Sequence, residues 1–109
     1  MSGLSEKDCV PCRGGVPPLQ GRELTLLLAQ LPSGWEVVEE HHLTKRFPFT
    51  EFTDGLAFLN RVAALCEEQG HHGDLTLAWG SVTLTVWTHK IDGLTESDFV
   101  WAAKADALA

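Results

Sequence analysis

A β-hairpin pattern over residues 75–87 is the feature that most limits the fold of this chain. Apolar and polar side chains alternate through two runs, and Gly80-Ser81 lies between them. Alternation with a period of two is typical of strands with one buried face, and glycine at the first central position favours a type II′ turn. We therefore predict two antiparallel strands, 75–79 and 82–87, with these residues on the inward face: Leu75, Leu77, Trp79, Val82, Leu84 and Val86.

The segment before the hairpin predicts an amphipathic helix over residues 51–69. Its apolar residues recur at three- and four-residue spacing, which places them on one helix face. Gly70 follows directly and is the residue type that most often ends a helix. The predicted buried stripe is Phe52, Leu56, Leu59, Val62, Ala63 and Cys66.

Two further helices and two further strands complete the pattern. Leucines at helical spacing predict a helix over 19–31, and short apolar alternations predict strands at 35–39 and 42–50. Thr95 is a suitable N-cap for a last helix, with Asp98 three residues later as its capping-box partner. The order α-β-β-α-β-β-α favours an α+β fold: a four-stranded antiparallel sheet with helices packed on one face.

The length of 109 residues corresponds to one domain. Small and polar residues, followed by Pro17-Pro18, predict a flexible N-terminal arm over 1–16 and a folded domain over 17–109. The arm contains Cys9-x-x-Cys12, which has the spacing of half a zinc site. Two interpretations stay open: reduced thiols in the arm, or a zinc ion completed by other ligands or by a second subunit. Cys66 falls on the helix stripe as a core residue.

The formal charge of −7 restricts the partners of this protein. Nucleic-acid binding needs a basic surface, and the only local basic pair is Lys45-Arg46, so direct nucleic-acid binding is not expected. No apolar run approaches the roughly 20 residues of a membrane span. The first twelve residues also lack the apolar region of a signal peptide. We predict a cytoplasmic location, and a partner or substrate that is neutral, cationic or small.

The hairpin register brings two histidines together. If Gly80-Ser81 is the turn, Trp79 pairs with Val82, and the same register places His72 opposite His89. Directly opposed Cβ atoms are about 5 Å apart. Histidine exchanges protons near neutral pH, so this pair suggests acid–base chemistry.

Two more side chains extend this cluster. His71 adjoins His72, and Glu67 lies four residues before His71, a spacing at which the two can hydrogen-bond if the helix persists. A carboxylate beside His71 would favour its charged form. The other pair, His41-His42, has no carboxylate at a comparable spacing and is interpreted as part of a turn.

These residues together resemble the pterin-4a-carbinolamine dehydratase family. The resemblance rests on Glu67-x-x-x-His71-His72, then Trp79, then THKIDGLTESD over residues 88–98, and it covers about 17–107. It implies removal of water from 4a-hydroxytetrahydrobiopterin, which recycles the cofactor of aromatic amino-acid hydroxylases. It implies no metal or other cofactor, no membrane, and a homodimer or homotetramer.

The resemblance also implies roles for the residues. His71 and His89 would act as acid and base, His72 would bind and orient the pterin, and Glu67 would orient and tune His71. Asp98 matches an active-site acid position, in addition to its capping role. The family usually has proline after the histidine pair, whereas this chain has Gly73, which would loosen the turn. Two tryptophans are candidates for stacking on a planar ligand, as an alternative to core positions: Trp79 and Trp87.

Other functions stay open beside the dehydratase. A metal-dependent hydrolase would use Glu67 and His71 as ligands, with His72 or His89 as the third. Against it, adjacent residues of an extended segment point to opposite faces. A pterin-binding or protein-interaction module without turnover is a second alternative, because animal members of the family also serve as dimerisation partners of a transcription factor. A role near molybdopterin metabolism is a third.

Overall fold

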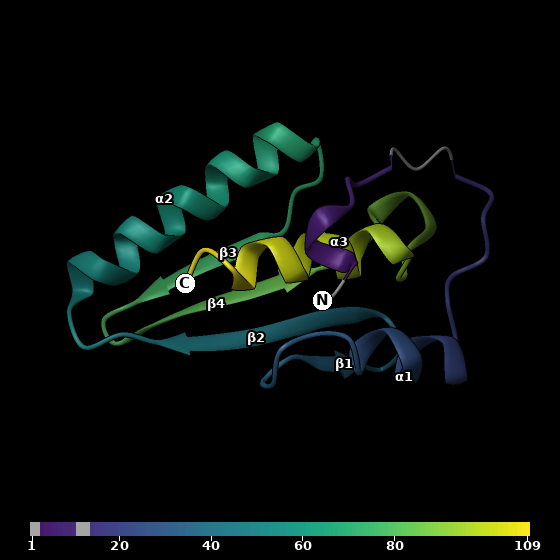
Figure 1. Cartoon of the computed structure of the whole chain (residues 1–109), viewed down its shortest axis with the longest axis horizontal. Helices are drawn as coiled ribbons and strands as arrows, with labels where there is room; N and C mark the ends of the chain where they lie inside the picture. The colour runs from purple at the N-terminus through teal and green to yellow at the C-terminus, as the bar shows by residue number, and fades with distance from the viewer. Residues whose placement is uncertain (1–2, 11–13) are drawn as a thin grey trace.

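Four strands form one antiparallel sheet in the order β1-β2-β4-β3 in a computed structural model that describes residues 3–10 and 14–109 (Figure 1). The predicted α+β class and element order are confirmed, and helices α2 and α3 cover one face of the sheet. The strands are β1 (Glu36–Val38), β2 (His42–Pro48), β3 (Asp74–Ala78) and β4 (Ser81–Val86). The helices are α1 (Arg22–Leu28), α2 (Phe52–Gln69) and α3 (Glu96–Asp106), with short 3₁₀ turns η1 (Leu4–Glu6) and η2 (His89–Ile91).

The core lies between the sheet and these helices. Alternate residues of the two central strands are fully or almost fully buried, among them Leu43 and Phe47 on β2 and Leu84 on β4. The residues between them face the other side, where the hydroxyl groups of Thr44 and Thr85 lie 3.1 Å apart across the strands. This alternation is the physical basis on which the sheet pattern was predicted.

Helix α2 buries a stripe that only partly matches the predicted one, since Val62 and Cys66 are buried as predicted. Its buried residues are Gly55, Phe58, Val62, Leu65 and Cys66, whereas Phe52 and Leu56 remain 43% and 39% exposed. The ring of Phe58 packs 4.8 Å from that of Phe47. A Cβ atom on Gly55 would already be in contact with Leu77, so this glycine lets the helix approach β3 closely. Phe58, rather than Phe52 of the predicted stripe, therefore lies on the buried face of the helix.

The predicted position of the β3–β4 turn was also wrong. Ala78 pairs with Ser81, so Trp79 and Gly80 form the turn, and Trp79 is 83% exposed instead of inward. The cause is a contact with another strand. Ser81 also pairs with Pro48 of β2, so β4 begins one residue earlier than predicted. The shift keeps Leu75 and the other inward residues on the buried face, because the pleat has a period of two.

The structure near the two ends of the chain differs from the sequence predictions. Helix α1 begins only after Gly21, whose φ of 54° is not helical, so it is shorter than predicted. The described part of the predicted arm includes Leu4, which is 1% exposed and lies in the core beside α3. As a result α3 is buried on nearly all sides, including Trp101. The division into an arm and a domain stays a prediction.

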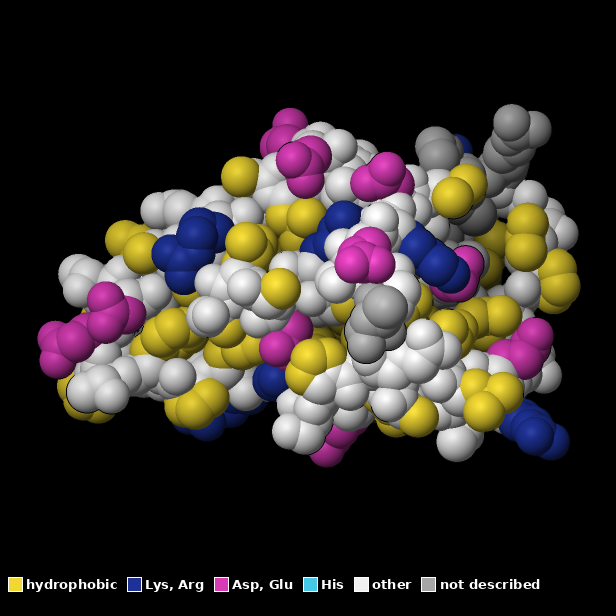
Figure 2. All heavy atoms as spheres, in the orientation of Figure 1, with side chains coloured by type: hydrophobic (Ala, Val, Ile, Leu, Met, Phe, Trp, Pro, Cys, Tyr) yellow, Lys and Arg dark blue, Asp and Glu magenta, His cyan; other side chains and the backbone are white. Residues whose placement is uncertain are grey.

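The face of the molecule in Figure 2 carries its charge in separate spots. On the face in Figure 2, Lys and Arg side chains lie singly among acidic and apolar ones. Within the described residues, no helix has the length and apolar content to cross a membrane.

Candidate active site

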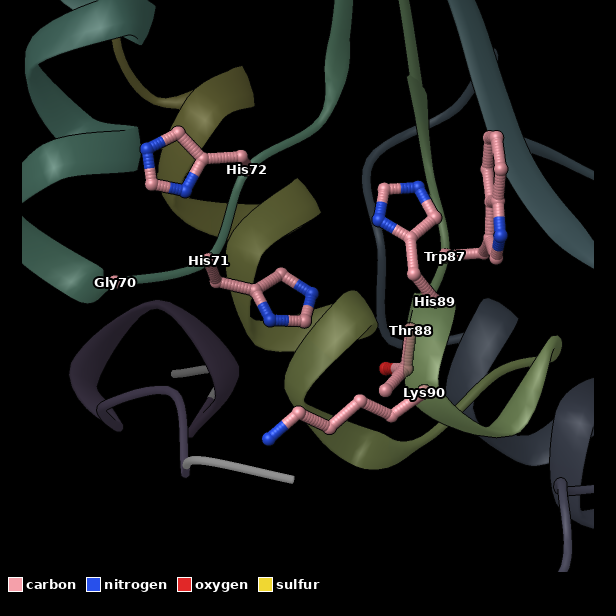
Figure 3. A pocket seen from close by; sticks show the side chains of 7 residues that line it. All are labelled: Gly70, His71, His72, Trp87, Thr88, His89 and Lys90. Carbon is pink, nitrogen blue, oxygen red and sulfur yellow. The ribbon is translucent and has the colours of Figure 1, made fainter. Parts of the chain in front are cut away.

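A pocket of about 330 Å³ lies where the end of α2 meets the loop after β4. In Figure 3 the ring of His71 points toward the side of His89 and Trp87, whereas the ring of His72 points back toward the end of α2. The lining residues are Gly70, His71, His72, Trp87, Thr88, His89 and Lys90. All three predicted histidines therefore line one pocket.

The convergence does not arise from the predicted hairpin register. His72 precedes β3, and His89 follows β4 in η2, so neither residue is part of the strand ladder. His71 and His72 are placed by Gly70, which ends α2 in the left-handed conformation at φ 61°. This αL residue turns the chain away from the helix axis and toward the loop that carries His89.

His71 is held by Asp98, and the predicted pairing with Glu67 was wrong. The Nε2 atom of His71 lies 2.6 Å from Oδ1 of Asp98, and the Asp98 side chain is fully buried. The i, i+4 argument required the helix to continue through His71. Because α2 ends at Gly70, the side chain of His71 is directed to the N-terminus of α3 instead.

Glu67 pairs with His72. Its Oε2 atom lies 2.6 Å from Nε2 of His72, but both side chains are mostly exposed, at 80% and 59%. Exposed pairs of this kind contribute little to stability, about 0–1 kcal/mol. Two histidine–carboxylate pairs of equal length therefore differ in burial, and the His71–Asp98 pair is the constrained one.

Asp98 both caps helix α3 and contacts His71. Its Oδ2 atom accepts hydrogen bonds from the backbone N–H of Thr95, at 2.9 Å, and from the hydroxyl of Thr88, at 2.7 Å. The predicted capping box of Thr95 and Asp98 is present. The cap leaves Oδ1 for His71, so the start of α3 fixes the position of the imidazole. Thr88 is a site residue that the sequence analysis missed, because only the fold places it beside Asp98.

One more prediction about the surroundings needs correction. Trp79 lies at the β3–β4 turn, at the opposite end of the hairpin from the pocket, so it does not line the site. His41 lies in a turn as predicted, and its Nε2 atom lies 2.7 Å from Oδ1 of Asp92. That pair links residues 51 positions apart, which no local spacing could predict.

Gly73, directly after the histidine pair, occupies a closely packed position. A Cβ atom there would lie 2.9 Å from the carbonyl oxygen of Thr85 and 2.9 Å from Cη2 of Trp101. Contacts below 3.0 Å force neighbouring atoms to move, and one of these neighbours is backbone. The buried Trp101 ring thus occupies the space that a side chain at position 73 would need.

We expect Gly73→Ala to lower the free energy of unfolding by about 1–3 kcal/mol, because it overpacks this contact. Urea denaturation measures the change. Gly80→Ala is the matched control, since a Cβ there meets nothing within 4 Å. The cost of Gly73→Ala should fall in a Trp101→Phe background, because phenylalanine lacks the crowding atoms. Equal destabilisation by the Gly73 and Gly80 variants would contradict this account.

Cys9 is placed near the site by the arm. Its backbone N–H donates to Oε1 of Gln69 at 2.8 Å, and its thiol lies 3.5 Å from the carbonyl oxygen of Ser97. Burial, and secondarily the Asp98 carboxylate, raises the pKa of the thiol to about 11. Both interpretations of the Cys9-x-x-Cys12 pair stay open. Cys12 lies outside the described residues.

The ligands suggested for a metal-dependent hydrolase are separated. Glu67 is paired with His72, whereas His71 is turned inward to Asp98. Across residues 3–10 and 14–109, no group of three or more His, Cys, Asp or Glu side chains is arranged to hold a metal ion.

Comparison with known proteins defines the class. The family model for pterin 4 alpha carbinolamine dehydratase matches residues 17–108, so the chain belongs to this family. A protein of Rubrobacter xylanophilus named "Putative pterin-4-alpha-carbinolamine dehydratase" is 63% identical over 108 residues, which cover 99% of this chain and 100% of the relative. The resemblance inferred from the sequence is confirmed.

Two solved structures are similar as well. The crystal structure of a transcriptional coactivator/pterin dehydratase from Brucella melitensis matches with a TM-score of 0.78 and 31% identity, over 84% of this chain and 98% of that one. A pterin dehydratase-like protein described as a RuBisCO assembly factor in the α-carboxysome matches with a TM-score of 0.61 and 32% identity. That match covers 70% of this chain and 89% of the other.

Proposed function

We propose that this protein dehydrates 4a-hydroxytetrahydrobiopterin to quinonoid dihydropterin by histidine acid–base catalysis, and so recycles the cofactor of aromatic amino-acid hydroxylases. The observation that carries the proposal is the buried His71–Asp98 pair facing His89 across one pocket. Membership of the dehydratase family supports the reaction class.

The reaction asks for two proton transfers. The lone pair of N5 expels the C4a hydroxyl group, which must receive a proton to leave as water, and N5–H must lose its proton. Two imidazoles placed on different sides of a planar heterocycle can perform both steps. No redox change occurs, because the electrons of the broken C–O bond leave with the oxygen.

His71 is suited to act as the base. Its Nε2 atom faces the Asp98 carboxylate, which assigns the Nε2–H tautomer from geometry and leaves Nδ1 as the accepting nitrogen. The Asp98 carboxylate holds the His71 ring in this orientation through the 2.6 Å contact with Nε2. The arrangement is that of a histidine oriented by an acidic partner, as in other proton-transfer sites.

His89 is suited to act as the acid, and His72 to bind the pterin. Among the described residues, the His89 ring makes no hydrogen bond, so its nitrogens are available to the leaving hydroxyl group. His72 is exposed and paired with the exposed Glu67, which suits substrate orientation better than proton transfer. Trp87 supplies an aromatic wall on the side of His89.

We also propose that the protein forms a homodimer or homotetramer. Phe52 and Leu56 leave an apolar strip exposed on α2, and β3 is an edge strand with no partner on its outer side among the described residues. Both features are typical of surfaces that bind another chain.

A protein-interaction role is the second candidate. The similarity to a protein described as a RuBisCO assembly factor favours it, because this shows that the fold can serve in assembly. The intact cluster of three histidines supports catalysis in this chain. A pterin analogue that binds the protein without any turnover of 4a-hydroxypterin would favour the binding role.

The direct test generates 4a-hydroxytetrahydropterin and follows formation of the quinonoid dihydropterin by absorbance, with and without the protein. We expect acceleration that is proportional to protein concentration. An unchanged rate would reject catalysis on this substrate.

A further inference from the structure

The three pocket histidines are oriented by different kinds of contact. His71 and His72 each lie 2.6 Å from a carboxylate oxygen. The His89 ring instead packs edge-on against Trp87, with ring centroids 4.4 Å apart and planes at 87° (Figure 3). Because the described residues offer this ring no hydrogen bond, the position of His89 depends on where Trp87 lies.

Trp87 is supported from behind by the second histidine pair. The ring centroid of His41 lies 5.1 Å from that of Trp87, and the ring centroid of His42 lies 6.1 Å away. The Nδ1 atoms of the two histidines are 3.0 Å apart, so one donates to the other. Four aromatic rings therefore form a continuous packed row from the β1–β2 turn to the pocket.

Asp92 ties the same turn to the loop that carries His89. Thr88 and Gly93 close this loop, because the N–H of each donates to the carbonyl oxygen of the other, at 2.8 and 3.3 Å. Asp92 lies inside the closed loop, and its Oδ1 atom lies 2.7 Å from Nε2 of His41. The loop is thus closed by backbone bonds between Thr88 and Gly93, and the side chain of the adjacent Asp92 pairs with His41.

The turn that presents His41 is strained. Glu39 and Glu40 have φ values of 53° and 54°, in the left-handed region that favours glycine. The turn is closed by the N–H of His41, which donates to the carbonyl oxygen of Val38 at 2.9 Å. Strain of this kind persists where surrounding contacts determine the conformation, and it is frequent near functional sites.

We propose that His41 and Asp92 are positioning residues that act through Trp87 and the Thr88–Gly93 loop to fix the imidazole of His89. The inference rests on the proposed function, since it assigns these residues to the same proton-transfer site. It gives a role to the histidine pair 41–42, which the reaction itself does not use.

The test compares variants that keep the local backbone but change the contact. Asp92 has a φ of 52°, so Asp92→Gly and Asp92→Asn both suit its conformation. Glycine removes the bond to His41, whereas asparagine retains an accepting oxygen. His41→Phe keeps a ring against Trp87 and removes the bond to Asp92. Glu36→Ala, an exposed carboxylate on the same hairpin, is the control.

We expect Asp92→Gly and His41→Phe each to lower kcat about tenfold while KM changes less than about twofold, because the reacting geometry is lost and not the binding surface. Asp92→Asn should restore most of kcat. The double variant should be no worse than His41→Phe alone, because both substitutions remove the His41–Asp92 bond and His41→Phe also removes the bond to His42. A kcat within twofold of the wild type in both single variants would overturn the proposal.

A second readout does not depend on activity. The Trp87 ring shifts the NMR signals of the His89 ring protons, which are identified by their loss in His89→Ala. We expect these signals to move or broaden in Asp92→Gly and His41→Phe, and to stay in place in Glu36→Ala. Unmoved signals would overturn the positioning role. If the wild type proves inactive on 4a-hydroxypterin, the proposed function fails, and these spectra still decide whether the His41–Asp92 pair positions His89.

Discussion

Replacement of His71 by alanine is expected to lower kcat for dehydration by about 10²-fold or more, and His89→Ala should have an effect of similar size. Each variant removes one of the two groups that move protons, and positioned acid or base groups contribute about 10²–10⁴-fold. KM should change little, because neither ring is the main binding surface in the proposed mechanism. Stopped-flow absorbance measurements on freshly generated 4a-hydroxypterin give both constants.

His72→Ala is the matched comparison for these two variants. It removes an imidazole from the same pocket, but one that is exposed and held only by Glu67. We expect it mainly to raise KM. The assignment of roles would be reversed if His72→Ala abolished turnover while His71→Ala retained it.

Asp98→Ala is expected to reduce the free energy of unfolding by about 3 kcal/mol or more, and to remove the orientation of His71. The fully buried carboxylate is bonded to three groups, from His71, Thr88 and Thr95, and its loss leaves buried polar atoms without partners. Removing one member of a buried pair typically costs about 3–5 kcal/mol. Chemical denaturation measures this loss, and the dehydration assay is run at a temperature where the variant is folded.

Comparing Glu67→Ala with Asp98→Ala tests whether burial, rather than the length of the hydrogen bond, determines the loss of stability. The bond of Glu67 to His72 has the same 2.6 Å length as the His71–Asp98 bond, but it is exposed to solvent. We expect a loss below about 1 kcal/mol. Similar stability losses in the two variants would show that burial does not explain the difference between the pairs.

Local sequence patterns predicted which helices and strands form. The rotation of α2 and the position of the β3–β4 turn depended on contacts between elements. The helix ending at Gly70 and the capping box of Thr95 and Asp98 were both predicted, because each depends on residues within one turn. The rotation of α2 was not predicted, because it depends on the packing of Phe58 against Phe47 and Phe49 across the core. The β3–β4 turn was misplaced for the same reason, because pairing of β4 with β2 decides where β4 begins.

The sequence by itself determined the composition of the site: three histidines, a carboxylate that caps a helix, and the family to which their spacing belongs. Only the tertiary structure decided which carboxylate pairs with which histidine. Helical spacing predicted that Glu67 pairs with His71. The left-handed Gly70 ends that helix, so His71 pairs with Asp98 and His72 pairs with Glu67. The pairing of His41 with Asp92 likewise appears only in the folded chain. Spacing predicts contacts within an element, whereas contacts between elements depend on how those elements end and pack.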